Sequence, residues 1–380
     1  MSLAEEMKLS FQPSMKLEKA LKAMQSHIEH LALELPDQQE QAWLHRWALI
    51  STVGASTRIE NAVLTDAEIE WVDTTLSESN GQTAFEENKQ HIIDKLSKDH
   101  ERSIEEVVGC REVLSLVYLQ ADQLFPLTET AIRGLHHKLL NFYPEAKRYA
   151  GRYKETTNQV VSINHDTGQK RIVLDPTPPG PQTEAAMQEL VNWYNQILPV
   201  HPWPLLVATE FVFRFLAIHP FQDGNGRLGR ALFLMSLLHA EDQALNNIVR
   251  LISIDRQIER HRPLYYSVLQ QTSNGRFRNN AKDYDLEPLA WFFLKMFDHA
   301  CKDIAVLRNK YAALQRLSES ATRVLACFRM APERRMKLAD LIAETGLVRR
   351  TVQNALQPLL AAGFIQRKGT GPATRYQLIF

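Results

Sequence analysis

Apolar side chains recur every three or four positions between Met15 and about Ala300, and this spacing places them on one face of an α-helix. Residues 16–35, for example, set Leu17, Leu21 and Ile28 on a single stripe. We therefore expect a mainly α-helical fold over this region. Further helices with the same spacing are predicted at 39–61, 103–122, 128–143, 184–198 and 285–308.

Residues 160–174 interrupt the helical pattern. Two short runs rich in β-branched side chains flank a polar turn that contains Gly168, which is typical of a β-hairpin. The stretch that follows, PTPPGP at 176–181, is too rich in proline to continue either element. We expect a single hairpin from Val160 to Leu174 on an otherwise helical domain.

The pattern changes again after about Ser320. A short helix ends in a tight turn at Thr345 and Gly346, a second helix spans 348–361, and two short strands surround 367–375. This order predicts a winged helix-turn-helix whose recognition-type helix is the second one. Pro358 lies inside that helix, and we expect it to kink or shorten the helix, since an interior proline costs about 3 kcal/mol.

The charge of the chain is balanced overall but uneven along its length. Its 380 residues have room for two or three domains and carry 44 basic and 44 acidic side chains. Residues 321–380 hold ten Lys or Arg against three Asp or Glu, a net charge of +7, so the rest of the chain carries −7. We divide the chain into an N-terminal helical region (1–110), a helical core (111–300), a linker helix (301–320) and the winged helix-turn-helix (321–380).

The cysteines and the apolar runs bear on the cellular compartment. Cys110, Cys301 and Cys327 show neither CxxC nor Cys/His spacing, so we expect buried, reduced side chains and no structural zinc. The N-terminal segment carries early acidic residues and lacks the apolar run of a secretory signal. No apolar run approaches the roughly 20 residues that span a bilayer. These features predict a cytoplasmic protein without a membrane partner.

The most unusual stretch is IHPFQDGNGRLGR, residues 218–230, which lies between two apolar helical segments. Pro220 must end the first helix near His219, because the residue before a proline avoids the α conformation. The DGNG loop then opens onto the N-terminus of the second helix, where free backbone N–H groups bind anions. A phosphate is the expected occupant.

The polar side chains of this stretch suit phosphate chemistry. His219 titrates near neutral pH and can accept a proton from a nucleophile. Asp223 is a hard oxygen ligand that suits Mg²⁺ shared with phosphates. Arg227 and Arg230 lie three positions apart, share a helix face and can bind phosphate oxygens. Each feature alone occurs in ordinary structural roles, but their combination within a dozen residues favours a polyphosphate site.

The stretch HPFQDGNGRLGR resembles the signature of the Fic (filamentation induced by cAMP) family, His-x-Phe-x-(Asp/Glu)-Gly-Asn-Gly-Arg-x-x-Arg, at every defined position. GLHHKLL, AGRYKETTNQVVSI, MQELVNWYN and HPWPLLVATEFVFRFLAIHPF extend the resemblance, in the family's order, over about residues 120–300. It implies a Fic-type helical core with a β-hairpin flap, followed here by the winged helix-turn-helix. It also implies a protein adenylyltransferase, which transfers AMP from ATP to a hydroxyl of a target protein and releases pyrophosphate, with Mg²⁺ as cofactor.

The resemblance assigns roles to the matching residues. His219 would deprotonate a Ser, Thr or Tyr hydroxyl of the target, and Asp223 would bind Mg²⁺ between the α- and β-phosphates. Residues 224–226 would form the anion hole, Arg227 would hold the inner phosphates and Arg230 the γ-phosphate. The residues expected to contact ATP are Glu60, Ser162, Ile163, Asn164, Asp223, Gly224, Asn225, Gly226, Arg227, Leu228, Gly229, Arg230, Tyr265 and Tyr266.

Three supporting elements complete the expected site. The hairpin at 160–174 resembles the family's flap, whose free backbone edge aligns the target segment by β-strand addition, although a purely structural hairpin is the alternative. Tyr265 and Tyr266 resemble the element that lines the adenine pocket, but tyrosines at this spacing also occur in cores. Phe221 is expected to anchor the loop in the core.

The upstream stretch STRIEN, residues 56–61, resembles the family's inhibitory helix, (Ser/Thr)-x-x-x-Glu-(Gly/Asn). Ser56 and Glu60 share a helix face, and Asn61 suits a C-terminal cap. The resemblance implies that Glu60 pairs with Arg230 and displaces the γ-phosphate, so that ATP binds unproductively. In some relatives the same glutamate helps to remove AMP, which makes reversal a second activity to test.

The leading interpretation is therefore an autoinhibited protein adenylyltransferase. An alternative is an ATP-sensing, DNA-binding transcriptional regulator without transferase activity, which His219 and Asp223 disfavour because a sensor needs no base. A third interpretation keeps the enzyme but replaces ATP by a phosphocholine or UMP donor. The target protein and the oligomeric state stay open, with a homodimer among the options. The winged helix can bind either DNA or a protein partner.

Overall fold

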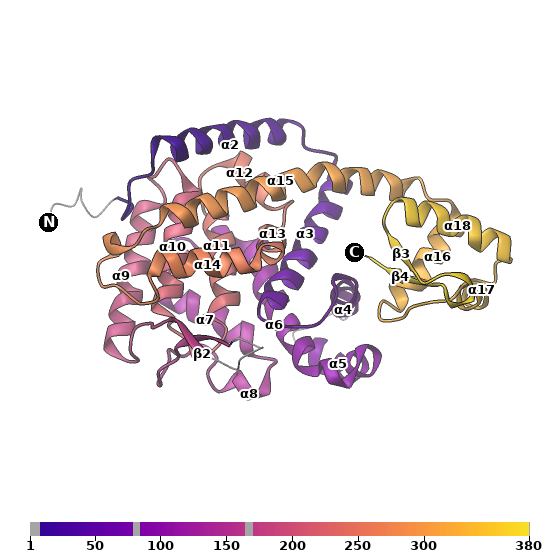
Figure 1. Ribbon diagram of the computed structural model, residues 1–380, viewed down its shortest axis with the longest axis horizontal. Coiled ribbons are helices and arrows are strands. Elements are labelled where there is room, and N and C mark those ends of the chain that lie inside the picture. The colour runs from indigo at the N-terminus through magenta and orange to yellow at the C-terminus, as the bar shows by residue number, and fades with distance from the viewer. Residues whose placement is uncertain (1–7, 79–83, 164–169, 380) are drawn as a thin grey trace.

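The computed structural model describes residues 8–78, 84–163 and 170–379, and α-helices make up most of this part of the chain (Figure 1). The mainly α-helical fold predicted from the apolar spacing is therefore confirmed. The helices of the main body are α2 (Met15–Leu33), α3 (Gln38–Ile59), α4 (Asp66–Glu78), α5 (Ala84–Leu96), α6 (Glu101–Gln120), α7 (Glu129–Leu140), α8 (Pro144–Lys147), α9 (Pro181–Ile197), α10 (Pro204–Ile218), α11 (Asn225–Leu238), α12 (Gln243–Val249), α13 (Ile254–Arg260) and α14 (Arg262–Ser273).

Helices α10 and α11 form the centre of the main body. Every residue of α10 except Pro204 and Arg214 is buried, as is every residue of α11 except Gly226. Helices that are apolar on all sides belong in the interior, and α3, α6, α7, α9 and α15 (Glu287–Gln315) pack around this pair. The loop that joins α10 to α11 is therefore held between two immobile, enclosed ends.

Helix α3 connects the surface of the main body to this centre. Its N-terminus is capped by Asp37, whose carboxylate accepts hydrogen bonds from the backbone N–H groups of Gln39 and Glu40. Glu60 is the C-cap, and Asn61 follows in the left-handed conformation with φ 75°, as expected of an asparagine at this position. The predicted helix end is confirmed.

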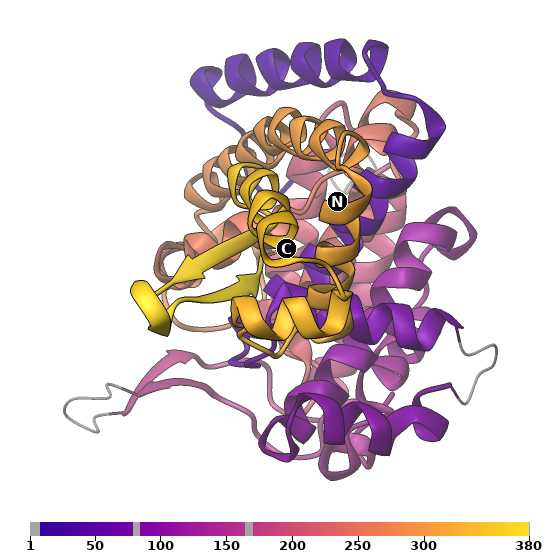
Figure 2. The ribbon, with the colours of Figure 1, turned by 90° about the vertical axis from the view of Figure 1, so that its right-hand side faces the viewer.

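The predicted hairpin at 160–174 is also confirmed in its two strands. Strand β1 (Val160–Ile163) pairs antiparallel with β2 (Lys170–Leu174), with Ile163 opposite Lys170 and a bulge between the first two residues of β1. Figure 2 shows these strands extending away from the helical body. The tip of the hairpin, which includes the predicted ATP contact Asn164, lies outside the described residues.

Beyond the main body, the C-terminal module (residues 319–379) has a hydrophobic core of its own. The long helix α15 (Glu287–Gln315) leads to it (Figure 1). The linker helix predicted at 301–320 is not a separate element, because α15 continues to Gln315 and α16 begins at Glu319. The module consists of α16 (Glu319–Met330), α17 (Leu338–Thr345), α18 (Arg349–Ala361), β3 (Ile365–Lys368) and β4 (Arg375–Leu378).

The module follows the order of helix, turn, helix and two strands that the sequence predicts. Gly346 ends α17 in the left-handed conformation with φ 66°. The expectation that Pro358 shortens the second helix is wrong, since α18 runs through it to Ala361. Pro358 and Asn354 both lie on the exposed side, where the backbone carbonyl that loses its helical partner can bond to water instead.

Contacts with the main body fix the module in place. Glu333 forms an ion pair with Lys95 of α5 at 3.4 Å, and Ala67 of α4 belongs to the module's core cluster. The Lys310 ammonium of α15 lies 5.3 Å from the centre of the Phe364 ring. The module is thus packed against α4, α5 and α15.

Two further expectations concern the burial of the cysteines and the length of the apolar segments. Cys110 and Cys301 are buried free thiols, but Cys327 is only half-buried, where it packs against the core of the C-terminal module. Over residues 8–78, 84–163 and 170–379, no helix has both the length and the apolar character needed to cross a membrane.

A close approach between α6 and α7 can be tested with two alanine substitutions. A Cβ at Gly109 of α6 would lie 2.0 Å from the backbone carbonyl oxygen of Leu139 in α7, whereas a Cβ at Gly134 of α7 would meet nothing within 4 Å. We expect Gly109→Ala to lower the free energy of unfolding in urea by about 1–3 kcal/mol, because the helices must separate. Gly134→Ala should raise it by about 0.5–1 kcal/mol. Equal effects of both substitutions would contradict the packing of α6 on α7.

Candidate active site

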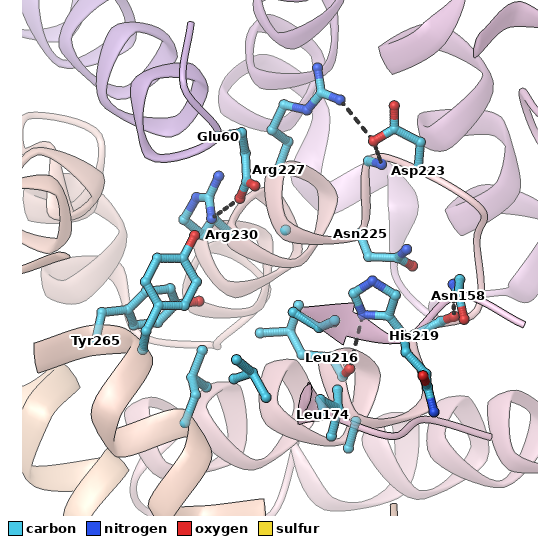
Figure 3. Close-up of a pocket in the computed structure, with 18 of the residues that line it drawn as sticks. Glu60, Asn158, Leu174, Leu216, His219, Asp223, Asn225, Arg227, Arg230 and Tyr265 are labelled. Atoms are coloured by element: carbon cyan, nitrogen blue, oxygen red, sulfur yellow. Dashed lines mark hydrogen bonds and ion pairs between the residues drawn. The ribbon is translucent and has the colours of Figure 1, made fainter. Parts of the chain in front are cut away.

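A cavity of about 500 Å³ lies at the junction of α10 and α11 (Figure 3). It brings together the residues that the sequence singled out in the stretch 218–230, namely His219, residues 223–227 and Arg230. Other parts of the chain complete its walls. The contributions from α3, α6, the hairpin and α14 include Glu60, Arg102, Glu106, Asn158, Leu174, Tyr265 and Tyr266.

The N-terminus of α11 forms one wall of this cavity. Gly224 is the N-cap residue, with φ 79°, and no side chain caps the helix. A 14-residue helix that begins uncapped presents free backbone N–H groups and the positive end of its dipole. The cavity wall therefore favours a bound anion, as the DGNG sequence predicts.

His219 lies where α10 is forced to end. Its backbone adopts the left-handed conformation, with φ 52° and ψ 58°, directly before Pro220. Its Nδ1 lies 3.3 Å from the carbonyl oxygen of Leu216 and so carries the proton, because a carbonyl oxygen can only accept. Burial, with the nearby Lys154 ammonium acting in the same direction, lowers the pKa of His219 to about 4. At neutral pH its Nε2 is a free base.

The loop beneath His219 is anchored by a ring stack. Phe221 is fully buried and stacks on His136 of α7 with 3.7 Å between the ring centres, which confirms its expected role as an anchor. His136 donates from Nε2 to the carbonyl oxygen of Asp223 at 2.9 Å, and its Nδ1 accepts from the N–H of Gly151 at 3.0 Å. Burial lowers the pKa of His136 to about 4, so it holds the loop as a neutral ring.

Two residues that the sequence analysis did not single out also hold the loop. Asn158 donates from Nδ2 to the carbonyl oxygens of His219 at 3.1 Å and Phe221 at 2.6 Å. Lys154, which is buried, donates to the carbonyl oxygen of Ile218 at 3.0 Å. Both lie in AGRYKETTNQVVSI, so the match to this stretch was the signal that could have identified them.

The side chain of Asn225 in the DGNG loop has a structural task. Its side-chain Oδ1 accepts from the N–H of Phe221 at 3.0 Å, and its Nδ2 donates to the carbonyl oxygen of Phe221 at 2.7 Å. The amide of Asn225 is therefore used to close the loop. Only its backbone N–H is available to an anion in the cavity.

Arg227 is a buried arginine with unused donors. Its Nη2 lies 3.3 Å from Oδ1 of Asp223, and its Nη1 lies 3.8 Å from Oε1 of Glu106. Neither Nε nor Nη1 has a hydrogen-bond partner within the described ranges. Buried guanidinium donors are normally satisfied, so these two point to a missing anionic ligand.

Arg230 is held at the other end of the cavity. Its Nη1 donates to Oε1 of Glu60 at 2.9 Å, and Ser56 accepts from Nε at 3.0 Å and from Nη2 at 2.7 Å. Asp255 adds a second carboxylate, 3.6 Å from Nε. Burial would lower the pKa of Arg230, but the two acids raise it instead. The two arginines thus share the cavity but point towards different ends of it (Figure 3).

The Glu60 carboxylate occupies the space above the first turn of α11. A Cβ at Gly226 would lie only 2.2 Å from its Oε1. Because this space lies at the helix N-terminus and against Arg230, it is where an anionic ligand would be stabilised most. In this structure the Glu60 carboxylate fills this space and pairs with Arg230.

Some expected ATP contacts are not part of the cavity. Leu228 is fully buried, and a Cβ at Gly229 would meet Leu216 and Phe215, so both face the core. A helix turns by about 100° per residue, which directs 228 and 229 away from the face that carries 227 and 230. Ser162 and Ile163 lie in β1, and their contact with ATP stays a prediction.

The expected adenine contacts do line the cavity. Tyr265 is 1% exposed and stacks on Phe292, and the hydroxyl of Tyr266 lies 3.5 Å from the carbonyl oxygen of Ile59. Tyr265 is labelled beside Arg230 in Figure 3. Their role with adenine stays a prediction.

Asp223 fits a magnesium ion only if phosphates share it. Its side chain is 40% exposed towards the cavity, and Oδ1 accepts from the N–H of Gly224 and from Arg227. Within the described part of the chain, no three His, Cys, Asp or Glu side chains cluster as a metal site. Mg²⁺ is commonly bound by one or two carboxylates together with phosphates and water, and a single aspartate suits that arrangement.

Comparison with known proteins agrees with this geometry. Residues 126–237 match the family model described as Fic/DOC family. A Fido domain-containing protein of Dictyostelium discoideum is 48% identical over 50 residues, which cover 13% of this chain and 35% of that protein. The protein adenylyltransferase Fic of Nematostella vectensis is 28% identical over 199 residues, 51% of this chain and 39% of that protein. The chain therefore spans less than half the length of these curated relatives.

Solved structures show the same fold. A Fic family protein from Desulfovibrio desulfuricans has a TM-score of 0.57 at 20% identity, with 98% of both chains covered. A Fic domain containing signaling protein from Bacteroides thetaiotaomicron has a TM-score of 0.52 at 20% identity, covering 76% of this chain and 96% of that one. The fold and the site define a helical protein whose residues 126–237 match the Fic/DOC family model and whose solved structural neighbours include Fic proteins.

The buried His136 makes stability depend on pH. The pKa of His136 is about 4 in the folded chain, below its ordinary value of 6.5, so between these values only the unfolded chain takes up the proton. Folding stability is therefore lost as pH falls from about 6.5. We expect wild type to lose up to roughly 1.4 kcal/mol per pH unit more than His136→Gln between pH 6.5 and 5. Urea unfolding at several pH values measures this difference, and parallel pH profiles would contradict the neutral, buried ring.

Proposed function

We propose that this chain is a protein adenylyltransferase that transfers AMP from ATP to a Ser, Thr or Tyr hydroxyl of a target protein. The observation that carries the proposal is the union, in one cavity, of a free base, an uncapped helix N-terminus and two buried arginines. A cavity of about 500 Å³ is of the size that small-molecule sites occupy. The Fic/DOC match and the adenylyltransferase relative support the same reaction.

The phosphates of ATP have complementary partners along the cavity. The first N–H groups of α11 and the unused donors of Arg227 suit the inner phosphates, and Arg230 suits the γ-phosphate. Tyr265 and Tyr266 supply an aromatic wall for adenine. Mg²⁺, held by Asp223 jointly with the phosphates, would neutralise part of their charge.

His219 would perform the proton transfer. As the target hydroxyl oxygen forms a bond to the α-phosphorus, the bond from that phosphorus to the pyrophosphate oxygen breaks, and the hydroxyl proton passes to Nε2 of His219. The lone pair of Nε2 is available because Nδ1 donates to Leu216. The loop anchors at His136 and Asn158 keep this imidazole in place, which matters because phosphoryl chemistry depends on positioning and charge stabilisation.

The hairpin would align the target. Val160 of β1 and Val173 and Leu174 of β2 line the cavity, so the sheet reaches the site of the attacking hydroxyl. In the described strands β1 pairs only with β2, which leaves the outer edge of each strand free to add an extended segment. Backbone hydrogen bonds would then set the position of the target residue opposite His219.

Glu60 would inhibit the enzyme from within the same chain. Its carboxylate pairs with Arg230 and lies over the first turn of α11, so it competes with the γ-phosphate for both. ATP that binds without these contacts places its α-phosphate out of line with the base. The wild-type chain would therefore be a weak transferase whose activity rises when Glu60 is removed.

The inhibition by Glu60 is tested by labelling with ATP that carries a radioactive α-phosphate. We expect Glu60→Gly to raise AMP incorporation by roughly tenfold or more, since each 1.4 kcal/mol of lost competition is a factor of ten. Glu60→Gly/His219→Ala should return incorporation to background, because no base remains. Mass spectrometry of the labelled proteins checks for the AMP increment.

Glu34→Gly is the matched control for this experiment. Glu34 caps the C-terminus of α2 as Glu60 caps that of α3, but its side chain is 60% exposed and lies outside the cavity. It should leave incorporation at the wild-type level. Equal AMP incorporation by wild type and Glu60→Gly would disprove the inhibition by Glu60. AMP incorporation that survives the loss of His219 would disprove the proposed role of His219 as the base.

A further inference from the structure

Helix α18 of the C-terminal module has two sharply different faces. Its inner face packs into the module through Val352, Ala355, Leu356 and Leu359, all of which are buried. Its outer face is exposed to solvent and contains basic and amide side chains but no acid. These outer residues are Arg349, Arg350, Gln353, Asn354 and Gln357.

The acids of the module are engaged away from this face. Glu333 pairs with Lys95 at 3.4 Å, Glu344 pairs with Arg334 at 2.8 Å, and Asp340 accepts from the backbone N–H of Lys337 at 2.8 Å. The net charge of +7 is therefore not neutralised where α18 faces solvent. The exposed cations of that face and of the β3–β4 hairpin form no ion pair with any described residue. They are Arg349, Arg350, Arg367 and Lys368.

The amide side chains are spaced so that they could contact successive base pairs, and we call this stripe the reading surface. Arg350, Gln353, Asn354 and Gln357 occupy positions i, i+3, i+4 and i+7, so they form one stripe along the helix. At 1.5 Å per residue the stripe is about 10 Å long, which equals about three base-pair steps of 3.4 Å. Asn and Gln amides donate to and accept from an adenine edge at once, and Arg does the same for guanine.

We propose that α18 enters the major groove of duplex DNA. Its amides contact base edges, while Arg349 at its N-terminus and the hairpin cations Arg367 and Lys368 contact phosphates. The deep, narrow major groove of duplex RNA excludes a helix, and an acidic protein surface would need the cations but not the amide stripe. The module lies at the end of the molecule far from the Fic-type core (Figure 1), so DNA and ATP can bind together.

The proposed phosphate contacts are tested with the full chain and a fluorescent 24-base-pair DNA duplex of random sequence. We expect anisotropy to show binding at 50 mM salt that weakens as salt rises. Arg349→Ala/Lys368→Ala should reduce the slope of log Kd against log salt by about two, since each phosphate contact contributes about 0.9. Lys19→Ala/Lys22→Ala removes the same charge from the exposed side of α2 and should leave the slope unchanged.

The reading surface is tested by selecting bound sites from a random duplex pool. Gln353→Ala/Asn354→Ala/Gln357→Ala should lower the preference for the selected site by tenfold or more and leave the salt slope intact. The proposal is overturned by an absence of binding at 50 mM salt. Equal affinity for duplex RNA would also overturn it. The same holds if the α2 control loses as much of the salt slope, or if the amide variant keeps its preference for the selected DNA site.

A second inference concerns Asp255 and depends on the proposed function. Arg230 contacts two carboxylates, of which only Glu60 lines the cavity. Asp255 lies in the first turn of α13, is 4% exposed, and has its pKa raised by burial to about 6, which leaves it ionised at neutral pH. A buried guanidinium that lost Glu60 would still have this countercharge.

We infer that Asp255 is a positioning residue that keeps Arg230 directed at the γ-phosphate once Glu60 has left. Helix α13 is anchored independently of the Glu60 side chain. Glu259 accepts from Nε of Arg58 at 2.6 Å, and Arg256 donates to Ser51 at 3.0 Å. Asp255 therefore stays in place while the side chain of Glu60 exchanges with ATP.

Calorimetric binding of ATP and ADP to Glu60→Gly and Glu60→Gly/Asp255→Asn tests this role. We expect the second substitution to weaken ATP binding about tenfold and to leave ADP binding unchanged within twofold, because ADP lacks the phosphate that Arg230 holds. Equal weakening of both nucleotides would show a merely structural role and overturn the inference. Because nucleotide binding is measured without AMP transfer, this experiment tests the role of Asp255 separately from the proposed reaction.

Discussion

The site depends on one constraint, the forced end of α10 before Pro220. A buried helix cannot stop in the interior unless its free backbone groups find partners. Here the carbonyl oxygens of Ile218 and His219 accept from Lys154 and Asn158, and the loop is fixed below by the stack of Phe221 on His136. Because α11 then starts without a side-chain cap, the same break that positions His219 also leaves the first backbone N–H groups of α11 free to bind an anion.

The second feature of the site is its balance of buried charge. Two nearly buried guanidinium groups would be costly without anions, and the chain provides them from different elements. Glu60 of α3 and Asp255 of α13 compensate Arg230, whereas Arg227 has only a 3.3 Å contact with Asp223 and a distant one with Glu106. Arg230 is thus satisfied without a ligand and Arg227 is not. This asymmetry explains how a cavity with two buried arginines can fold with an internal carboxylate in part of its space.

Basic side chains have different environments in the two parts of the structure. The cavity encloses its cations among carboxylates and an apolar core, while the C-terminal module exposes its cations on α18 and the β3–β4 hairpin. Helix α15, 29 residues long, belongs to both parts, and contacts at Lys95 and Ala67 tie the module to the N-terminal helices.

The sequence by itself determined the helical class, the hairpin strands, the end of α10 and the stretch 218–230 whose residues meet in the cavity. These properties depend on local rules, since apolar spacing, proline before a turn and glycine at a helix start act within a few residues. It did not show that Leu228 and Gly229 face the core, that the Asn225 amide closes the loop, or that α15 absorbs the expected linker. Those outcomes depend on which face of a helix meets its neighbours. The roles of His136, Asn158 and Asp255 likewise required contacts between segments far apart in the chain, which only tertiary packing decides.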